Sequence, residues 1–377
     1  MNKDRELVQG ILDEADIKIN GSRPWDLQVK NDNLFGRVLS GGSLALGESY
    51  MDDWWDVEQM DEFFYKILKA RLDQKVRPTF QLVARIVAAR LFNSQKKSKA
   101  FEIGERHYDV GNDIYEKMLD KRMVYTCGYW RDLEHKSENL DAAQEAKLDL
   151  VCRKIGLKSG DKVLDIGGGW GSFAKFAAEK YGVETVSITV SKEQIELGKR
   201  LCEGLLIELR FMDYRDIDGR EKFDHIVSLG MFEHVGEKNY RQFMEVAHKA
   251  LKDEGLFLLH TIGTNQSIIT SDPWINKYIF PNSMLPSPMM IGKAIDNLFT
   301  MEDWHNFSVN YYPTLMAWMH NFDEAWPELK DKYGDRFYRM WRFYLMASAA
   351  TFKSRNNQLW QIVLSKDGVP GGYDRIS

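Results

Sequence analysis

The sequence predicts an α/β protein in which a doubly wound parallel sheet carries a large apolar insertion and follows a smaller, mostly helical N-terminal domain. A short apolar run at residues 163–166 leads through glycines into a helical pattern at 172–181. Further apolar runs alternate with helical patterns at residues 185–190, 206–211, 225–229 and 256–262. This alternation is typical of parallel sheets. It stops after the last of these runs, where a stretch rich in aromatic residues and methionine begins.

The length and net charge of the chain limit the number of domains and the kinds of partner that we expect. The chain has 377 residues, enough for one large domain or two unequal ones. Its net charge is −5, from 51 basic and 56 acidic side chains. Nucleic-acid-binding proteins normally show a basic surface, so we expect no nucleic-acid partner.

Cysteine usage and hydropathy predict the compartment. Cys127, Cys152 and Cys202 form no CxxC pair, and an odd number of scattered cysteines is typical of a reducing cytoplasm. Residues 1–10 lack the apolar core of a signal peptide, and no window approaches the roughly 18 apolar residues of a membrane span. We therefore predict a cytoplasmic protein whose contact with a membrane is peripheral.

Residues 1–95 are predicted to form the helical N-terminal domain. Leu7, Ile11 and Leu12 have helical spacing, and apolar residues recur at similar intervals within 79–92. The aromatic residues between 54 and 64 are expected to be mainly core. A lipid pocket, a dimer contact and a domain interface are the other interpretations.

Residues 96–104 are predicted to link this domain to the main domain, residues 105–377. The surrounding stretch, 93–99, is polar and basic. A solvated linker is the favoured interpretation. The alternative is attraction to an anionic membrane surface, worth about 1 kcal/mol per basic residue near the surface.

The glycine motif after the first strand predicts a ligand loop. A dinucleotide fingerprint needs glycines at relative positions one, three and six, but the third of these is Ser172, after Gly167 and Gly169. Asp165, two residues before the first glycine, would repel a pyrophosphate and would tolerate a sulfonium with an amino-acid head. The run from Asp165 to Gly171 resembles motif I of class I S-adenosylmethionine-dependent methyltransferases.

Residues at the next two strand ends extend this candidate site. The second strand ends without the acid that often holds ribose hydroxyls, so Thr189 and Gln194 are the nearest polar candidates. After the third strand, Met212 offers an apolar face for an adenine ring, and Asp213 offers an acceptor for its amino group. Asp213 could equally cap the following helix.

A second candidate site lies beyond strands four and five. Glu233 follows the fourth strand and His260 lies at the end of the fifth. Neighbouring parallel strands end at the same sheet edge, about 4.8 Å apart, so the two side chains are expected to share one site. Two ligands fall short of the three or four that a zinc site needs, so we expect no metal. The alternative is a Glu–His pair that only closes the sheet edge.

Residues 271–352 are predicted to form a cap over the ligand end of the sheet, before a last strand at 359–364. Most of their aromatic side chains must be core. Their excess suggests a pocket for a long apolar substrate.

Motifs along nearly the whole chain resemble the bacterial cyclopropane-fatty-acyl-phospholipid synthases, with shared motifs in the mycobacterial cyclopropane mycolic acid synthases. Two of them are specific: DPWINKYIFP at 272–281 and EDWHNF at 302–307. Shorter ones are ERHYDVGND at 105–113, YTC at 125–127, LDIGGGWG at 164–171, MFEHVG at 231–236, LLHTIG at 258–263 and QLWQ at 358–361.

The resemblance implies two sets of site residues. It places S-adenosylmethionine against Tyr125, Thr126, Asp165, Gly167, Gly169, Gly171, Thr189, Gln194, Met212 and Asp213. It places a bicarbonate ion, partly through backbone groups, against Cys127, Glu233, His260, Ile262 and Tyr311. Glu233, His260, Tyr311 and Cys127 are then the expected catalytic residues. Relatives often carry a cysteine where this chain has Ser348, and chemistry without a covalent enzyme intermediate does not need it.

The resemblance also implies an activity and partners. The expected reaction moves a methylene group from S-adenosylmethionine to the cis double bond of an acyl chain in a membrane phospholipid, with bicarbonate as general base. A related lipid methyltransferase that leaves a methyl branch is the alternative, and a catalytically silent lipid- or cofactor-binding module is a third possibility. We further expect a homodimer bound peripherally to the inner face of the cell membrane.

Overall fold

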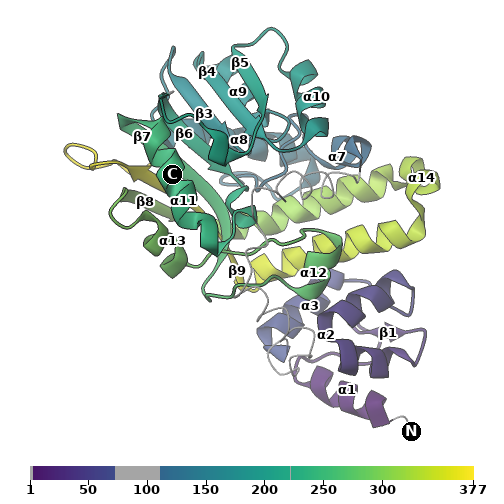
Figure 1. Cartoon of the computed structure of the whole chain (residues 1–377). Coiled ribbons are helices and arrows are strands. Elements are labelled where there is room, and N and C mark those ends of the chain that lie inside the picture. The colour runs from purple at the N-terminus through teal and green to yellow at the C-terminus, as the bar shows by residue number, and fades with distance from the viewer. Residues whose placement is uncertain (1–2, 73–110, 221) are drawn as a thin grey trace.

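The computed structural model describes residues 3–72, 111–220 and 222–377 (Figure 1). Within these ranges no helix has the length and apolar character needed to cross a membrane. The predicted helix at 79–92 and the predicted linker at 96–104 lie outside the described residues.

The described N-terminal region is helical, as the sequence predicts. Its elements are α1 (Lys3–Asp13), β1 (Gln28–Val29), α2 (Leu34–Met51), β2 (Trp55–Asp56) and α3 (Met60–Lys69), with β1 and β2 antiparallel. Phe63 and Phe64 of α3 are buried. The ring centroid of Phe64 lies 5.1 Å from that of Phe343 in the C-terminal part of the chain. The aromatic residues of this region are therefore mainly core, as expected, and this core is shared with residues of the C-terminal part of the chain.

Seven strands form one sheet in the order β5-β4-β3-β6-β7-β9-β8. They are β3 (Lys162–Ile166), β4 (Glu184–Thr189), β5 (Ile207–Phe211), β6 (Phe223–Leu229), β7 (Leu251–Thr264), β8 (Thr300–Asn306) and β9 (Asn357–Ser365). The five from β5 to β7 are parallel, and β9 is antiparallel to both of its neighbours. The strand order reverses between β3 and β6, which is where open α/β sheets bind ligands.

Helices cover both faces of this sheet. Successive strand residues point to opposite faces, so Val163 packs with α8 (Leu140–Lys154) and α9 (Ser172–Tyr181). Its neighbour Leu164 packs with α11 (Glu237–Ala250) and α13 (Pro288–Ile295). The remaining described α-helices are α7 (Asn112–Met118), α10 (Lys192–Leu201), α12 (Pro273–Tyr278) and α14 (Tyr311–Lys353).

Helix α14 is a long element that folds back on itself. Gly334 interrupts its 43 residues with φ 74°, a conformation that glycine adopts without a steric penalty. The two arms lie side by side (Figure 1), and the ring of Phe322 stacks on that of Tyr338 with centroids 5.8 Å apart. The arms connect the N-terminal helices to the sheet, because α14 contacts α2 and α3 and also strand β9.

The α/β prediction is confirmed, and the last strand predicted at 359–364 is present as β9, but the sequence-based prediction did not include β8. Within the predicted cap, β8 joins the edge of the sheet, and β9 makes the sheet mixed rather than wholly parallel. The buried side chains of β8 include Asp303 and His305, so its sequence lacks an apolar run. Lys154 of α8 meets them, with Nζ 3.6 Å from Asp303 Oδ2 and 3.0 Å from His305 Nδ1.

Candidate active site

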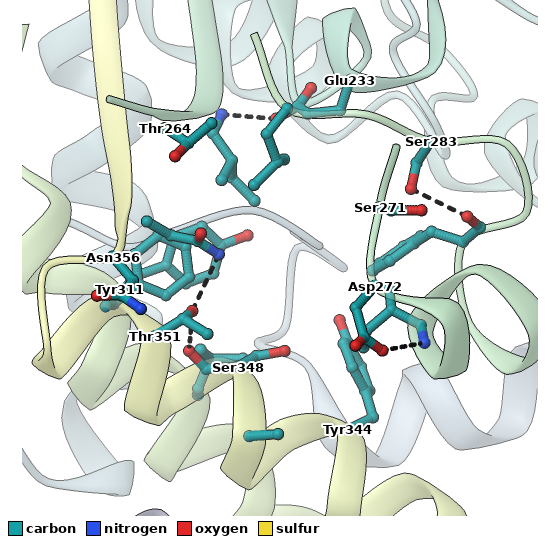
Figure 2. Close-up of a pocket in the computed structure, with 18 of the residues that line it drawn as sticks. Glu233, Thr264, Ser271, Asp272, Ser283, Tyr311, Tyr344, Ser348, Thr351 and Asn356 are labelled. Atoms are coloured by element: carbon teal, nitrogen blue, oxygen red, sulfur yellow. Dashed lines mark hydrogen bonds between the residues drawn. The ribbon is translucent and has the colours of Figure 1, made fainter. Parts of the chain in front are cut away.

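A continuous cavity of about 1210 Å³ begins at the glycine loop after β3 and extends to the N-terminal helices. Its wall includes Gly167 and Gly169 at one end, and Ile11 of α1, Phe35 of α2 and Ile67 of α3 at the other. Figure 2 shows a central part of it. There, Glu233 faces Tyr344, Ser348 and Thr351 across the open space.

The glycine loop packs tightly on its inner side and is open on its outer side. A Cβ at Gly168 would lie 2.8 Å from Asp165 Cγ and closer still to Ser187 Oγ. A Cβ at Gly169 would meet only Gln194 Nε2, at 3.8 Å, and Gly169 has φ 59°. The loop therefore leaves room for a ligand to approach the backbone at Gly169. The helix predicted after it begins at Ser172, with Gly171 at its N-cap.

Asp165 is buried at the base of this loop. Its Oδ2 accepts a hydrogen bond from Ser187 Oγ at 3.1 Å. Burial raises the pKa of Asp165 to about 7. A cationic group of a ligand at this position would favour the ionised carboxylate.

The residues predicted after β4 and β5 divide into two groups. Gln194 lines the cavity, and its Oε1 accepts a hydrogen bond from Thr189 Oγ1 at 2.7 Å. Thr189, Met212, Asp213 and Gly171 are not among the described residues of the cavity wall.

Asp213 caps the turn that follows β5. Its carboxylate accepts a hydrogen bond from Arg215 N at 3.0 Å, and its Oδ2 lies 3.1 Å from Arg215 Nη1. Of the two roles that the sequence left open, capping is the one seen in this structure.

Glu233 and His260 come together as the sequence predicts. Glu233 lies in a short 3₁₀ turn after β6, and His260 is paired with Leu229 across β6 and β7. Both side chains line the cavity. Ile262 N donates to Glu233 Oε1 at 2.6 Å, whereas Glu233 Oε2 and His260 Nε2 are buried without a hydrogen-bond partner among the described residues. Two such neighbouring groups are typical of a site that receives a polar ligand.

The protonation states at this site follow from burial. Burial raises the pKa of Glu233 to about 7 and lowers the pKa of His260 well below its usual value, so the imidazole is neutral at pH 7. Gln361 Nε2 lies 3.4 Å from His260 Nδ1, and an amide NH₂ can only donate. Because Nδ1 accepts from this amide, we assign the ring proton to Nε2. Nε2 is then a hydrogen-bond donor to the cavity.

Tyr311 and Cys127 differ in their access to the cavity. Tyr311 lines it and stacks on Phe352 with ring centroids 4.3 Å apart; burial raises its pKa well above the usual value, so the phenol keeps its proton. Cys127 is not part of the described wall, and its Sγ donates to Gly128 O at 3.1 Å. Burial also raises the pKa of the Cys127 thiol far above neutrality, so the nucleophilic thiolate is absent.

Tyr125 and Thr126 lie on the wall between the two predicted sites. Tyr125 OH is 2.9 Å from Tyr344 OH. Thr126 Oγ1 accepts a hydrogen bond from Lys147 Nζ at 2.7 Å. Tyr344 belongs to the aromatic stretch that was predicted to line a pocket. Lys147 was not predicted, although it lies three residues after the buried Gln144 of the same helix and so shares its face.

Comparisons with known proteins agree with this geometry. Residues 95–362 match the family described as mycolic acid cyclopropane synthetase. The cyclopropane-fatty-acyl-phospholipid synthase of Escherichia coli (strain K12) is 50% identical over 366 residues, which cover 97% of this chain and 94% of that protein.

Two solved structures are also similar. The cyclopropane synthase MmaA2 from Mycobacterium tuberculosis has a TM-score of 0.65 at 29% identity, covering 71% of this chain and 98% of that one. The mycolic acid cyclopropane synthase CmaA1, complexed with SAH and CTAB, has a TM-score of 0.64 at 29% identity and the same coverage. These matches confirm the resemblance found in the sequence motifs. The chain therefore belongs to the mycolic acid cyclopropane synthetase family, and it is an S-adenosylmethionine-dependent methyltransferase.

Proposed function

We propose that this chain transfers a methylene group from S-adenosylmethionine to the cis double bond of an unsaturated acyl chain in a membrane phospholipid, forming a cyclopropane ring. One observation carries the proposal: the cavity joins the glycine loop to a long, mainly apolar space walled by α14 and the N-terminal helices. A cofactor and an acyl chain can therefore meet in one cavity. The family and the relative from Escherichia coli support the same reaction.

The glycine loop fits S-adenosylmethionine, which supplies an electrophilic methyl group. The open approach at Gly169 admits its backbone contacts, and the buried Asp165 suits its positive charge. The proposed contacts are Tyr125, Thr126, Asp165, Gly167, Gly169, Gly171, Thr189, Gln194, Met212 and Asp213.

The wall around Glu233 fits bicarbonate, which supplies a base for the proton lost on ring closure. His260 Nε2 and the Tyr311 hydroxyl can donate hydrogen bonds to the anion, and Glu233 Oε2 can accept one from the O–H group of bicarbonate. The N–H group of Ile262 donates to Glu233 Oε1, so Ile262 acts by holding the Glu233 carboxylate in place. Since the Cys127 thiol points to Gly128, only the backbone of Cys127 remains for the ion.

Aromatic rings near this site suit a positively charged reaction path. The ring of Tyr125 lies 5.2 Å from that of Trp318, and Tyr311 lies 6.2 Å from the same ring. Aromatic faces stabilise a cation without reacting with it. Burial also excludes water, which would otherwise capture a carbocation.

The proposal includes a cytoplasmic homodimer that binds peripherally to the inner face of the membrane. Ile268 supports the membrane part, because it lines the cavity and is 48% exposed, so the cavity wall reaches the protein surface at an apolar side chain. Sedimentation with phospholipid vesicles tests the membrane contact, and light scattering tests the dimer.

The deciding experiment combines purified protein, labelled S-adenosylmethionine and vesicles of an unsaturated phospholipid. The proposal expects labelled lipid whose added carbon gives the high-field NMR signals of a cyclopropane methylene. A methyl-branched product would support the alternative methyltransferase, and no labelled lipid would contradict both. In buffer freed of carbon dioxide the rate should fall and return on addition of bicarbonate; full activity there would remove bicarbonate from the proposal.

A further inference from the structure

A buried lysine in the cavity wall is not explained by the fold. Lys147 of α8 is fully buried and lines the cavity together with Asp165 and Gly167. Its Nζ donates to Thr126 Oγ1 at 2.7 Å. Among the described residues, no carboxylate oxygen lies within the 4.0 Å of an ion pair. A buried cation without a paired anion is strongly unfavourable, so a functional reason is expected.

Lys154, on the same helix, shows how the fold treats a buried lysine that is purely structural. It is 1% exposed, its Nζ lies 3.6 Å from Asp303 Oδ2, and a second contact goes to His305 Nδ1 at 3.0 Å. Lys154 does not line the cavity. The two lysines thus differ in ion pairing and in access to the cavity.

The two carboxyl groups that interact electrostatically with Lys147 accept hydrogen bonds from other donors. Asp120 accepts hydrogen bonds from Val124 N at 2.8 Å and Arg122 N at 3.0 Å. Asp165 accepts one from Ser187 Oγ. Burial lowers the pKa of Lys147 to about 8, which leaves the amine mostly protonated at pH 7. The Nζ group has three donors, and one of them is used by Thr126.

We propose that Lys147 binds the carboxylate of the amino-acid part of S-adenosylmethionine. Charge-assisted hydrogen bonds to a carboxylate would satisfy the remaining donors of Nζ. Thr126 accepts from Lys147, so its own hydroxyl proton can be donated to the same carboxylate. Asp165 adds the opposite charge on the same wall, so the wall is complementary to a zwitterionic head. The inference rests on the proposed function only for the identity of the cofactor.

The test compares two ligands by calorimetry: S-adenosylhomocysteine, and its decarboxylated analogue, which lacks only the carboxylate. The wild-type protein should bind S-adenosylhomocysteine on the order of 100-fold more tightly, as expected for a buried charge pair that loses one partner. In Lys147→Met this preference should fall to within about 3-fold. Lys154→Met is the matched control, since it also removes a buried lysine of α8, and it should keep the full preference.

The outcomes separate this inference from the proposed function. If the wild-type protein binds both ligands equally, the inference is overturned without any variant. A full preference retained in folded Lys147→Met would overturn it as well. Failure of the wild-type protein to bind S-adenosylhomocysteine at all would instead contradict the proposed cofactor site.

Discussion

Gly168 offers the sharpest test of the glycine loop. It has no positive φ, so Gly168→Ala adds a methyl group without straining the backbone. The new Cβ would lie 2.8 Å from Asp165 Cγ and closer to Ser187 Oγ. Ser187 must then move, and its 3.1 Å hydrogen bond to Asp165 breaks. The new Cβ also falls on Asp165 Oδ2, so the substitution displaces both side chains at the base of the ligand loop.

The size of the effect follows from these two losses. Overpacking a dense core costs about 1–3 kcal/mol, and a lost hydrogen bond costs about 1 kcal/mol. The free energy of unfolding should fall by roughly 2–4 kcal/mol. Affinity for S-adenosylhomocysteine should fall too, because Asp165 loses the donor that orients it.

Ser187→Gly should rescue this variant only in part, because it removes the hydroxyl that the new methyl group meets and leaves the clash with the Asp165 carboxylate. Urea unfolding of the wild type, both single variants and the double variant gives the coupling energy, expected to be about 1–3 kcal/mol and favourable. Calorimetry on the same four proteins measures their affinity for S-adenosylhomocysteine and so reports the effect on the ligand loop. Equal stability of Gly168→Ala and wild type, or a double variant no better than Gly168→Ala, would refute the packing described at the loop.

Three further predictions concern the buried groups. Glu233→Gln should lower the rate about 10²- to 10⁴-fold in the vesicle assay, because a positioned proton-transfer group is lost. Its affinity for S-adenosylhomocysteine should stay within a few-fold of the wild type, because the glycine loop is intact. Cys152→Ala and Cys202→Ala should leave the rate nearly unchanged and Cys127→Ala should keep some activity, and mass spectrometry should find no thiol adduct in the working enzyme. Between pH 4.5 and 7 Glu233 should make the ligand-free protein less stable as pH rises, because the unfolded state ionises this carboxyl first. Its pKa of about 7 in the fold corresponds to about 3 kcal/mol in total, measurable by urea unfolding. Asp165 and Asp120, whose pKa values burial raises to about 7 and about 6, contribute in the same direction.

Controls distinguish these effects from general damage. Glu237→Gln is the control, because it changes an acidic side chain four positions from Glu233 that does not line the cavity. It should leave the rate and the pH dependence of stability unchanged. Glu233→Gln itself should reduce that pH dependence by the share that Glu233 contributes, while Asp165 and Asp120 keep theirs; an unaltered slope would contradict the raised pKa of Glu233.

The parts of the site that depend on local sequence were predictable. The loop and the helix start at Ser172 follow from glycines and strand pattern, and the meeting of Glu233 with His260 follows from the parallel edge. Lys147 was not predictable in the same way. Lysine in a helix is normally exposed, and only the three-dimensional cavity shows that this one lies on its wall.

Strand β8 could not be predicted for a related reason, whereas β9 was predicted from its apolar run. Asp303 and His305 interrupt the apolar pattern of β8, and their partner Lys154 lies about 150 residues away in the sequence. Such a distant polar cluster gives no local signal. Asp213 differs from this cluster because it caps a turn of neighbouring residues, and capping was one of the two roles predicted for it from the sequence.

The contact between α14 and the N-terminal helices limits how this chain can be divided. Trp274 and Phe343 are buried, with ring centroids 4.4 Å apart, and a Cβ at Gly47 of α2 would fall on the Trp274 ring. Phe343 also packs on Phe64. A truncated form without the N-terminal helices would expose these rings to water and open one end of the cavity, so it would be prone to aggregate and would hold an acyl chain poorly. Expression of the catalytic part alone would therefore require polar replacements on this face.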